Sequence, residues 1–358
     1  MNLKNKIENH IVDDMSKKQI KYLKAITPDQ AEGKLAEVYL QVRRDFQLVP
    51  PMTLFSPVAN LMAGLWSISR ESQIASGLIS REDKEAISAA VSSINTCDYC
   101  IDAHVGMLHG TSAHAVADSM LAGDMEGVDD PKTKSLINWA LATRTPQSEL
   151  LKKPPFSTEE MPEVIGTALS YHFINRMVAL FLGTSPLPVN TSKPMLRKIA
   201  TRIFGATAGK SIATKQVSGG DSLVFLPESS LPQAFSWAES NTHIAKAYAG
   251  FSSVMESAGE KTIPKEVRSH LINYLEKWQG EDMPLSRQWL EEAIKDLEEA
   301  HQDCARLVFL TALSPYQVDK KIIADFRKQY PTDEALLSAT CWASYAATKR
   351  ISQWVNPS

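Results

Sequence analysis

Apolar residues recur at every third or fourth position along most of this chain, whereas the strict alternation typical of β-strands is nearly absent. A spacing of three and four places apolar side chains on one face of an α-helix. Prolines interrupt the pattern, for example at Pro50 and Pro51 and again at Pro154 and Pro155, and separate one helical segment from the next. The pattern therefore predicts an all-α protein. The clearest helical segments are residues 35–42, 58–68, 84–94, 135–142 and 164–182.

The helical pattern also repeats, which predicts two copies of one helical unit. Residues 78–83 and 262–267 each open a helix and lie 184 positions apart, with Ser80 as the expected N-cap of the first and Pro264 in the first turn of the second. Further along, helices that start near 158 and 332 match at an offset of 174, and those around 136–143 and 307–314 match at an offset near 171. The order of these landmarks is preserved, so we expect a tandem repeat whose second copy has diverged.

This interpretation divides the 358 residues into an N-terminal extension (1–34), a first helical domain (35–184), a basic linker (185–230) and a second helical domain (231–358). The length suits two domains of ordinary size. Residues 185–220 contain six Lys and Arg residues and no acidic residue. We expect these cations to pack on acidic neighbours, and the alternative is a site for an anionic ligand.

Composition excludes several classes of protein. The chain has 38 basic and 41 acidic residues, and a net charge of -3 gives no field that would attract nucleic acid. No uninterrupted apolar run approaches the roughly 18 residues of a membrane span, and the N-terminus lacks a signal-peptide core. We therefore expect a cytoplasmic protein with neither nucleic acid nor a membrane as a partner. Its four cysteines are too few for a disulfide framework in a chain of this length, and two of them, Cys304 and Cys341, lie in apolar helical contexts that predict burial.

The most informative motif places two thiols and an imidazole within eight residues. At about 100° per residue, Cys97, Cys100 and His104 fall on a single helical face. A thiolate there has both a second sulfur and a base at hand. The preceding helix, 80–94, carries Glu85, and the residues Asn95 and Thr96 are expected to cap the next helix, with Cys97 in its first turn.

Two metal-binding interpretations fit the motif less well. Zinc could be held by the two thiols and His104 with His109 as a fourth ligand, but His109 lies about 140° from His104 on a continuous helix. Structural zinc sites usually gather ligands from two separate segments. Covalent haem attachment needs a histidine directly after the second cysteine, where this chain has Ile101. We expect no metal, and we expect His109 and His114 to be exposed or to cap helices.

Several residues around the thiols occupy a specific spacing. They are Glu85, Ser92, Asn95, Cys97, Tyr99, Cys100, Ala103, His104 and, later, Asn175 and Arg176. With this spacing, residues 35–183 resemble the AhpD-like alkylhydroperoxidase branch of the carboxymuconolactone decarboxylase superfamily. The resemblance implies an AhpD-like helical fold and a thiol-dependent peroxidase that reduces a small-molecule peroxide.

The same resemblance implies a role for each matching residue. Cys100 would be the peroxidatic thiol, Cys97 the resolving thiol, His104 the base and Glu85 the proton relay. Tyr99 stands where some peroxidases of this family have a second histidine. It is a possible auxiliary group, as is Asn95, which we expect to act mainly as a cap. The resemblance also implies no bound cofactor, an external dithiol or lipoyl-type reductant, and a homo-oligomer.

The second copy departs from this pattern. At the 184-residue offset, Ser269, Glu281, Pro284 and Gln288 replace the carboxylate, the two thiols and the imidazole. We expect chemistry only in the first copy. Two alternatives remain open: a redox sensor or scaffold whose dithiol switches an interface, and a cofactor-free lyase of the decarboxylase type, which would leave the two thiols unexplained.

Overall fold

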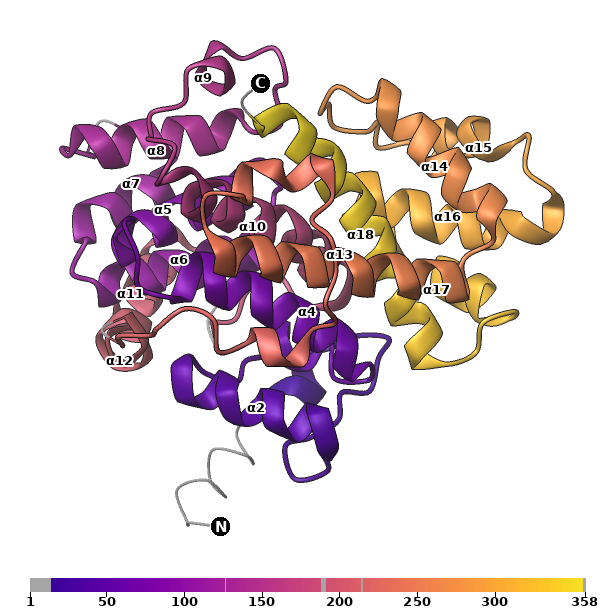
Figure 1. Ribbon diagram of the computed structural model, residues 1–358, viewed down its shortest axis with the longest axis horizontal. Helices are drawn as coiled ribbons and strands as arrows, with labels where there is room; N and C mark the ends of the chain where they lie inside the picture. Colours follow the sequence, from indigo (N-terminus) through magenta and orange to yellow (C-terminus); the bar gives the residue numbers. More distant parts are fainter. Residues whose placement is uncertain (1–13, 126, 188–190, 214, 357–358) are drawn as a thin grey trace.

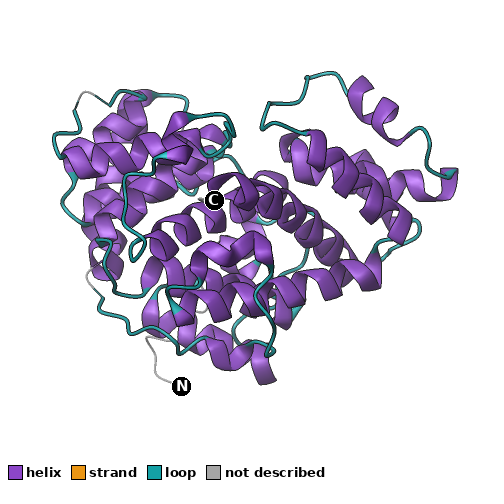
Figure 2. Ribbon diagram, turned by 45° about the horizontal axis from the view of Figure 1, so that its top comes forward, coloured by secondary structure: helices purple, strands orange, loops and turns teal. Residues whose placement is uncertain are grey.

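The computed structural model describes residues 14–125, 127–187, 191–213 and 215–356. Within these ranges the regular structure is helical and contains no strand, which confirms the prediction of an all-α fold (Figure 2). Residues 14–19 are helical. The helices that follow in the first half are α2 (Gly33–Asp45), α3 (Pro50–Thr53), α4 (Ala59–Ser69), α5 (Arg81–Ile94), α6 (Asp98–Gly110), α7 (His114–Ala122), α8 (Pro131–Ala142), α9 (Glu149–Lys152) and α10 (Met161–Phe181).

The second half begins after a crossing segment that is itself partly helical. That segment contains α11 (Pro194–Phe204), a π-helical turn (Gly205–Gly209), α12 (Lys210–Ala213) and two 3₁₀ turns (Leu223–Phe225 and Gln233–Ala238). The later helices are α13 (Thr242–Thr262), α14 (Lys265–Lys277), α15 (Gln288–Ile294), α16 (Glu299–Leu313), α17 (Lys320–Arg327) and α18 (Asp333–Val355), with a 3₁₀ turn at Pro315–Gln317.

Four helices drawn from both halves form the centre of the molecule. Helix α4 packs against α13, and α10 packs against α18, while α13 also packs against α18 (Figure 1). Buried hydrogen bonds accompany this packing: the Tyr248 hydroxyl of α13 donates to the Gly166 carbonyl of α10 at 2.6 Å, and the Ser344 hydroxyl of α18 donates to the Phe173 carbonyl at 2.7 Å. The two halves therefore share one continuous core.

Helix ends confirm the tandem repeat. Ser80 is the N-cap of α5, where its side chain accepts from the Asp83 amide, and Pro264 is the N-cap of α14, 184 positions later. The sequence predicted Pro264 in the first turn of this helix, but it lies one position earlier, at the N-cap. At an offset of 174 the last residue of α10 corresponds to the last residue of α18, and at 171 the end of α8 corresponds to the end of α16. Equivalent helices thus begin or end at equivalent residues.

The basic segment lies on the first half of the molecule. Helix α11 packs across α6. Arg197 of α11 forms an ion pair with Asp102 of α6, and Lys198 and Arg202 both pair with Asp118 of α7, at 3.0 and 2.7 Å. This agrees with the expectation that the cations pack on acidic neighbours.

One described helix, α10, is long and apolar enough to cross a membrane by length and composition alone. In this fold it is a core helix, since 89% of its most apolar stretch is buried. It also carries polar side chains that are buried inside the protein, including His172, Asn175 and Arg176. These polar groups make α10 part of the surroundings of the thiols.

Candidate active site

The two thiols lie at the turn between α5 and α6. Helix α5 ends at Ile94, Thr96 adopts a left-handed conformation with φ of 50°, and Cys97 is the N-cap of α6. A β-branched residue rarely adopts positive φ, so this turn is held by its surroundings, including a 2.9 Å hydrogen bond from the Cys97 amide to the Ser92 carbonyl. The expectation that Cys97 lies inside the first turn is corrected, because it caps the helix and Cys100 occupies the first turn.

The sulfur atoms of this pair face each other. Cys97 Sγ lies 2.9 Å from Cys100 Sγ, as two free thiols in hydrogen-bond contact. A disulfide bond is about 2.05 Å long, so bond formation requires only a small approach of the two atoms. Both residues are buried, with 3% and 4% of their surfaces exposed. The dithiol is therefore preformed and shielded from bulk water.

The imidazole and the carboxylate form a second close pair. His104 Nδ1 lies 2.6 Å from Glu85 Oε2, across the contact between α5 and α6. Arg81 Nε donates to the other carboxylate oxygen at 2.7 Å, and Gln73 Nε2 donates to the same oxygen at 3.3 Å. Tyr171 donates from its hydroxyl to Gln73 and sets its ring edge-on to the imidazole, with centroids 4.4 Å apart. Both oxygens of Glu85 are thus bonded, and the orientation of His104 is fixed.

The charge of Glu85 is stabilised despite complete burial. Burial alone would raise its pKa, but the guanidinium of Arg81 and the imidazole of His104 outweigh this effect and hold the pKa below its usual value. The carboxyl is therefore ionised at neutral pH. His104, which contacts this charged carboxylate, lies one turn of α6 after Cys100.

The Cys100 thiol, in contrast, is protonated at rest. Burial raises its pKa well above the usual value, and the neighbouring Cys97 raises it further. A hydrogen bond from the Asn175 side chain opposes both effects by favouring the thiolate. Asn175 is itself held by Asn95, which donates to its Oδ1 at 3.0 Å, and by Ser92, which accepts from its Nδ2 at 3.1 Å. Formation of the thiolate therefore needs a base.

The auxiliary residues lie where they can position others. Asn95 is the C-cap residue of α5, and Cys97 is the N-cap of α6, so the expectation that Asn95 and Thr96 cap the next helix is wrong. The Asn95 side chain also contacts His172 at 3.2 Å, so it links α5 to α10. The Tyr99 hydroxyl donates to Gln19 at 2.8 Å, and burial raises its pKa far above neutral. Tyr99 is therefore no base in this structure. It ties the N-terminal segment to α6.

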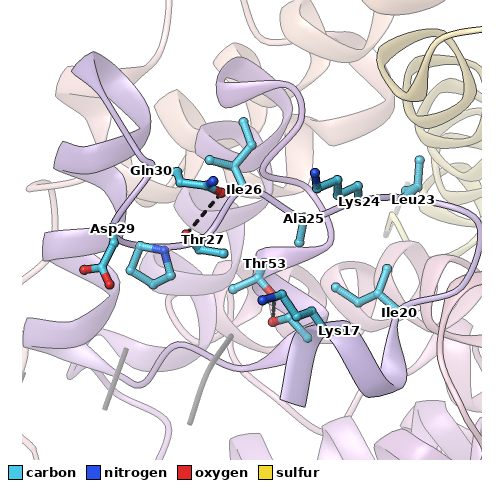
Figure 3. A pocket seen from close by; sticks show the side chains of 12 residues that line it. Lys17, Ile20, Leu23, Lys24, Ala25, Ile26, Thr27, Asp29, Gln30 and Thr53 are labelled. Atoms are coloured by element: carbon cyan, nitrogen blue, oxygen red, sulfur yellow. Dashed lines mark hydrogen bonds between the residues drawn. The ribbon is translucent and has the colours of Figure 1, made fainter. Parts of the chain in front are cut away.

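That N-terminal segment borders a cavity of about 560 Å³. Figure 3 shows its lining, which comes from the segment around residues 16–30 and from Thr53. None of the four central site residues lines this cavity. It is therefore separate from the dithiol, although Gln19, which bonds Tyr99, belongs to the same segment.

The zinc interpretation loses its fourth ligand. His109 bonds His114, with 3.0 Å between their Nδ1 atoms, and within the described ranges no group of three or more His, Cys, Asp or Glu side chains is arranged to hold a metal ion. His114 is exposed as expected, but His109 is buried, which corrects that expectation. Burial lowers the pKa of His109 to about 4, so this imidazole is neutral at pH 7.

Comparison with known proteins identifies the family. The model of the carboxymuconolactone decarboxylase family matches residues 61–115, the stretch that contains Glu85 and both thiols. Over 339 residues the chain is 31% identical to the alkyl hydroperoxide reductase Rv2159c of Mycobacterium tuberculosis, which covers 94% of this chain and 95% of that protein. The chain belongs to the carboxymuconolactone decarboxylase family, as an AhpD-like member.

Part of the chain is also similar to one of the solved structures. It is described as an alkylhydroperoxidase AhpD core, an uncharacterized peroxidase-related protein from Ralstonia eutropha JMP134. The two share 17% identity with a TM-score of 0.42, and the match covers 51% of this chain and 97% of the other.

Sequence reasoning missed part of the site of this family member. Arg81 precedes Glu85 by four residues on α5, so helical spacing alone could have linked them. Gln73 comes from a π-helical turn (Arg70–Ile74), a feature often found at functional sites, and no sequence signal revealed it. Tyr171 lies on α10, far along the chain. Asn175 was noted only as part of the resemblance, and sequence spacing gave no sign that its side chain lowers the pKa of Cys100.

Proposed function

We propose that this protein is a thiol-dependent peroxidase that uses Cys97 and Cys100 in a dithiol and disulfide cycle. The observation that carries the proposal is the pair of contacts at one site: 2.9 Å between the two sulfurs and 2.6 Å between His104 and Glu85. Similarity over most of the chain to an alkyl hydroperoxide reductase supports the same conclusion. No metal or bound cofactor takes part in the proposed cycle.

The first step is attack on the peroxide. His104 accepts the proton of the Cys100 thiol, and the thiolate attacks the nearer oxygen of the O–O bond. A sulfur–oxygen bond forms as the oxygen–oxygen bond breaks, which oxidises Cys100 to a sulfenic acid and releases an alkoxide. The proton held by His104 passes to the alkoxide, which leaves as an alcohol. Glu85 remains ionised and stabilises the transient imidazolium.

The second step uses the neighbouring sulfur. The Cys97 thiol attacks the sulfenic sulfur, a disulfide forms, and the hydroxyl of the sulfenic acid leaves as water with the Cys97 proton. An external dithiol then reduces the disulfide by two successive exchanges and leaves as its own disulfide. A dithiol or lipoyl-type reductant fits this step, and so does a reducing, cytoplasmic location.

Mass spectrometry of the intact protein tests the cycle. One equivalent of an organic hydroperoxide should lower the mass by about 2 Da through loss of two hydrogens, and Cys100→Ser should abolish this change. In Cys97→Ser the sulfenic acid cannot be resolved, so the mass should instead rise by about 16 Da. An unchanged mass in the native protein would contradict the proposal.

Turnover distinguishes an enzyme from a sensor. With excess peroxide and a dithiol such as dihydrolipoamide, repeated consumption of peroxide is expected, whereas a sensor would stop after one equivalent. The double variant Cys304→Ser/Cys341→Ser is the control, because it removes both thiols of the second half and leaves Cys97 and Cys100 in place. It should keep full turnover.

A further inference from the structure

A row of buried polar side chains runs from the end of α8 to the thiol site. Thr143 is the C-cap of α8, and its hydroxyl lies 2.8 Å from Nε2 of His172, a residue of α10. Nδ1 of the same imidazole lies 3.2 Å from Nδ2 of Asn95, which in turn donates to Oδ1 of Asn175 at 3.0 Å. Thr143 and His172 are fully buried. Neither takes part in the proposed steps of the cycle.

The direction of the hydrogen bonds is fixed at the α8 end by Thr143. Its single hydroxyl proton is donated to the Ala140 carbonyl at 2.7 Å. The hydroxyl can therefore only accept from His172, which places the imidazole proton on Nε2. The imidazole is neutral at pH 7, since burial lowers its pKa well below the usual value and the guanidinium of Arg176 lowers the pKa further. Nδ1 then carries no proton and accepts from Asn95.

The other end of the row is fixed in the same way by Ser92. Its hydroxyl donates to the Ser88 carbonyl at 2.7 Å, so it accepts from Asn175 Nδ2 at 3.1 Å. This turns Oδ1 of Asn175 toward Asn95, whose Nδ2 has two hydrogens, one for this oxygen and one for His172. Both ends of the row therefore require the same orientation of the two amides.

This orientation matters for Cys100. The Asn175 side chain lowers the pKa of the Cys100 thiol, which is the effect of an N–H donor on a thiolate. A proton on Nδ1 of His172 would face the N–H group of Asn95, so the Asn95 amide would turn and Oδ1 of Asn175 would lose its donor. Asn175 could then turn its oxygen toward the sulfur, which favours the thiol over the thiolate.

We propose that His172, with its proton on Nε2, is a positioning residue for Cys100. Its bare Nδ1 fixes Asn95, and Asn95 fixes Asn175 with an N–H group toward the sulfur. Because Thr143 and Asn95 occupy both of its ring nitrogens, His172 does not compete for the role of base. The inference rests on the proposed function, in which the Cys100 thiolate is the nucleophile.

Two substitutions of His172 separate positioning from packing. In His172→Asn the amide oxygen can lie near the position of Nδ1 and accept from Asn95, whereas in His172→Gln the amide lies near the position of Nε2. The readout is the rate of Cys100 alkylation by iodoacetamide over a range of pH, in the Cys97→Ser background, which needs neither peroxide nor reductant. His172→Gln should lower this rate about fivefold at neutral pH, with convergence at high pH, and His172→Asn less than about twofold.

Thr143 provides a second, independent pair of variants. Thr143→Val keeps the shape of the side chain but removes the hydroxyl that fixes the proton on Nε2 of His172, so alkylation should again slow about fivefold at neutral pH. Thr143→Ser keeps the hydroxyl and should slow it less than about twofold. Nitrogen NMR of the native protein, labelled selectively at histidine, should show His172 as the neutral form with its proton on Nε2.

Three results would overturn the proposal. The first is a proton on Nδ1 of His172 in the native protein. The second is an equal loss of alkylation rate in His172→Asn and His172→Gln with folding intact by circular dichroism, as a purely structural role would give. The third is an unchanged pH profile in both His172→Gln and Thr143→Val. Absence of peroxide turnover alongside the expected alkylation rates would instead contradict the proposed function and leave the positioning by His172 standing.

Discussion

The α5–α6 unit of the first half and the α14–α15 unit of the second share a framework but differ at one turn. Helices α5 and α14 have 14 and 13 residues and equivalent N-caps. Helix α6 then continues for 13 residues from Asp98, whereas α15 has 7 residues and begins at Gln288, the position equivalent to His104. The second half therefore lacks the helical turn that holds the thiols in the first.

In the second half, the residues at the positions of this turn cannot perform thiol chemistry. Pro284 stands at the position of Cys100, and in its place the chain is irregular from 278 to 287. The Trp278 side chain, which is 2% exposed, packs there under the guanidinium of Arg144, 5.8 Å from its ring centroid. The packing of the helices is therefore kept in both halves, whereas the short turn that holds the thiols is present only in the first.

The largest expected effect comes from the thiols of the first half. Cys100→Ser should lower peroxide turnover by about 10³-fold or more, because the nucleophile is lost. Burial raises the pKa of Cys304 to about 12 and raises that of Cys341 as well, so these second-half thiols stay protonated. A large loss of turnover in Cys304→Ser/Cys341→Ser, with folding intact, would contradict the assignment of chemistry to the first half.

The next effect concerns the carboxylate. Glu85→Gln removes the charge that stabilises protonated His104, and turnover should fall by about 10²-fold. Ser269, the equivalent residue of the second half, is exposed, so Ser269→Ala is the matched control and should leave turnover unchanged. Steady-state rates of the two variants, measured with the same peroxide and dithiol, give the comparison directly.

Glu85 should also contribute to stability in a pH-dependent manner. Its folded pKa lies below the ordinary value of 4.5, so its contribution is present above that value and is lost as the pH falls through the folded pKa. The difference in unfolding free energy between the native protein and Glu85→Gln should therefore be largest near neutral pH and shrink below about pH 4.5. Denaturant unfolding at several pH values measures this difference. A constant difference would contradict the lowered pKa.

A smaller effect is expected at Asn175. Asn175→Ala removes the hydrogen bond that favours the Cys100 thiolate, which should lower the rate of thiol oxidation about tenfold at neutral pH. Because the variant only makes deprotonation harder, its rate should approach that of the native protein as the pH rises. Stopped-flow oxidation over a range of pH distinguishes this from a simple loss of folding, which higher pH would not restore.

The smallest effect on chemistry is expected at the contact between the two units. Arg144 donates to the carbonyls of Ile94 and Gly280, at 2.7 and 2.8 Å, and thereby joins the end of α5 to the irregular stretch of the second half. Gly280 has φ of 90°, and a Cβ there would lie 1.8 Å from the Arg144 carbonyl oxygen. Gly280→Ala should destabilise the protein by about 1–3 kcal/mol while thiol chemistry at low temperature persists. Thermal melting measures this, with Gly183→Ala, which meets nothing within 4 Å, as the control.

Much of this architecture could be predicted from the chain alone, and the reasons are physical. Apolar spacing is a local property, so helices such as α5 and α10 and the repeat at offsets of 184 and 174 were visible in the sequence. The spacing of Cys97, Cys100 and His104 also predicted one helical face. The turn at Thr96 was not predictable, because its left-handed conformation depends on neighbours. Gln73 reaches Glu85, and Tyr171 reaches Gln73 and His104, only through tertiary packing, which leaves no trace in local spacing.

Helix α10 packs on its equivalent, α18, and helices α4 and α13 of the two halves also pack together, which has an evolutionary consequence. If the two halves were separate chains, these helix faces would have to meet by diffusion. Here the connecting chain holds the two halves together, so each sees the other at an effective concentration in the millimolar range or above. The first half therefore does not depend on the association of separate chains, and the second half needs only to supply a complementary apolar surface. Selection can then preserve the shape of the second half while its sequence at the turn equivalent to the thiol site drifts freely.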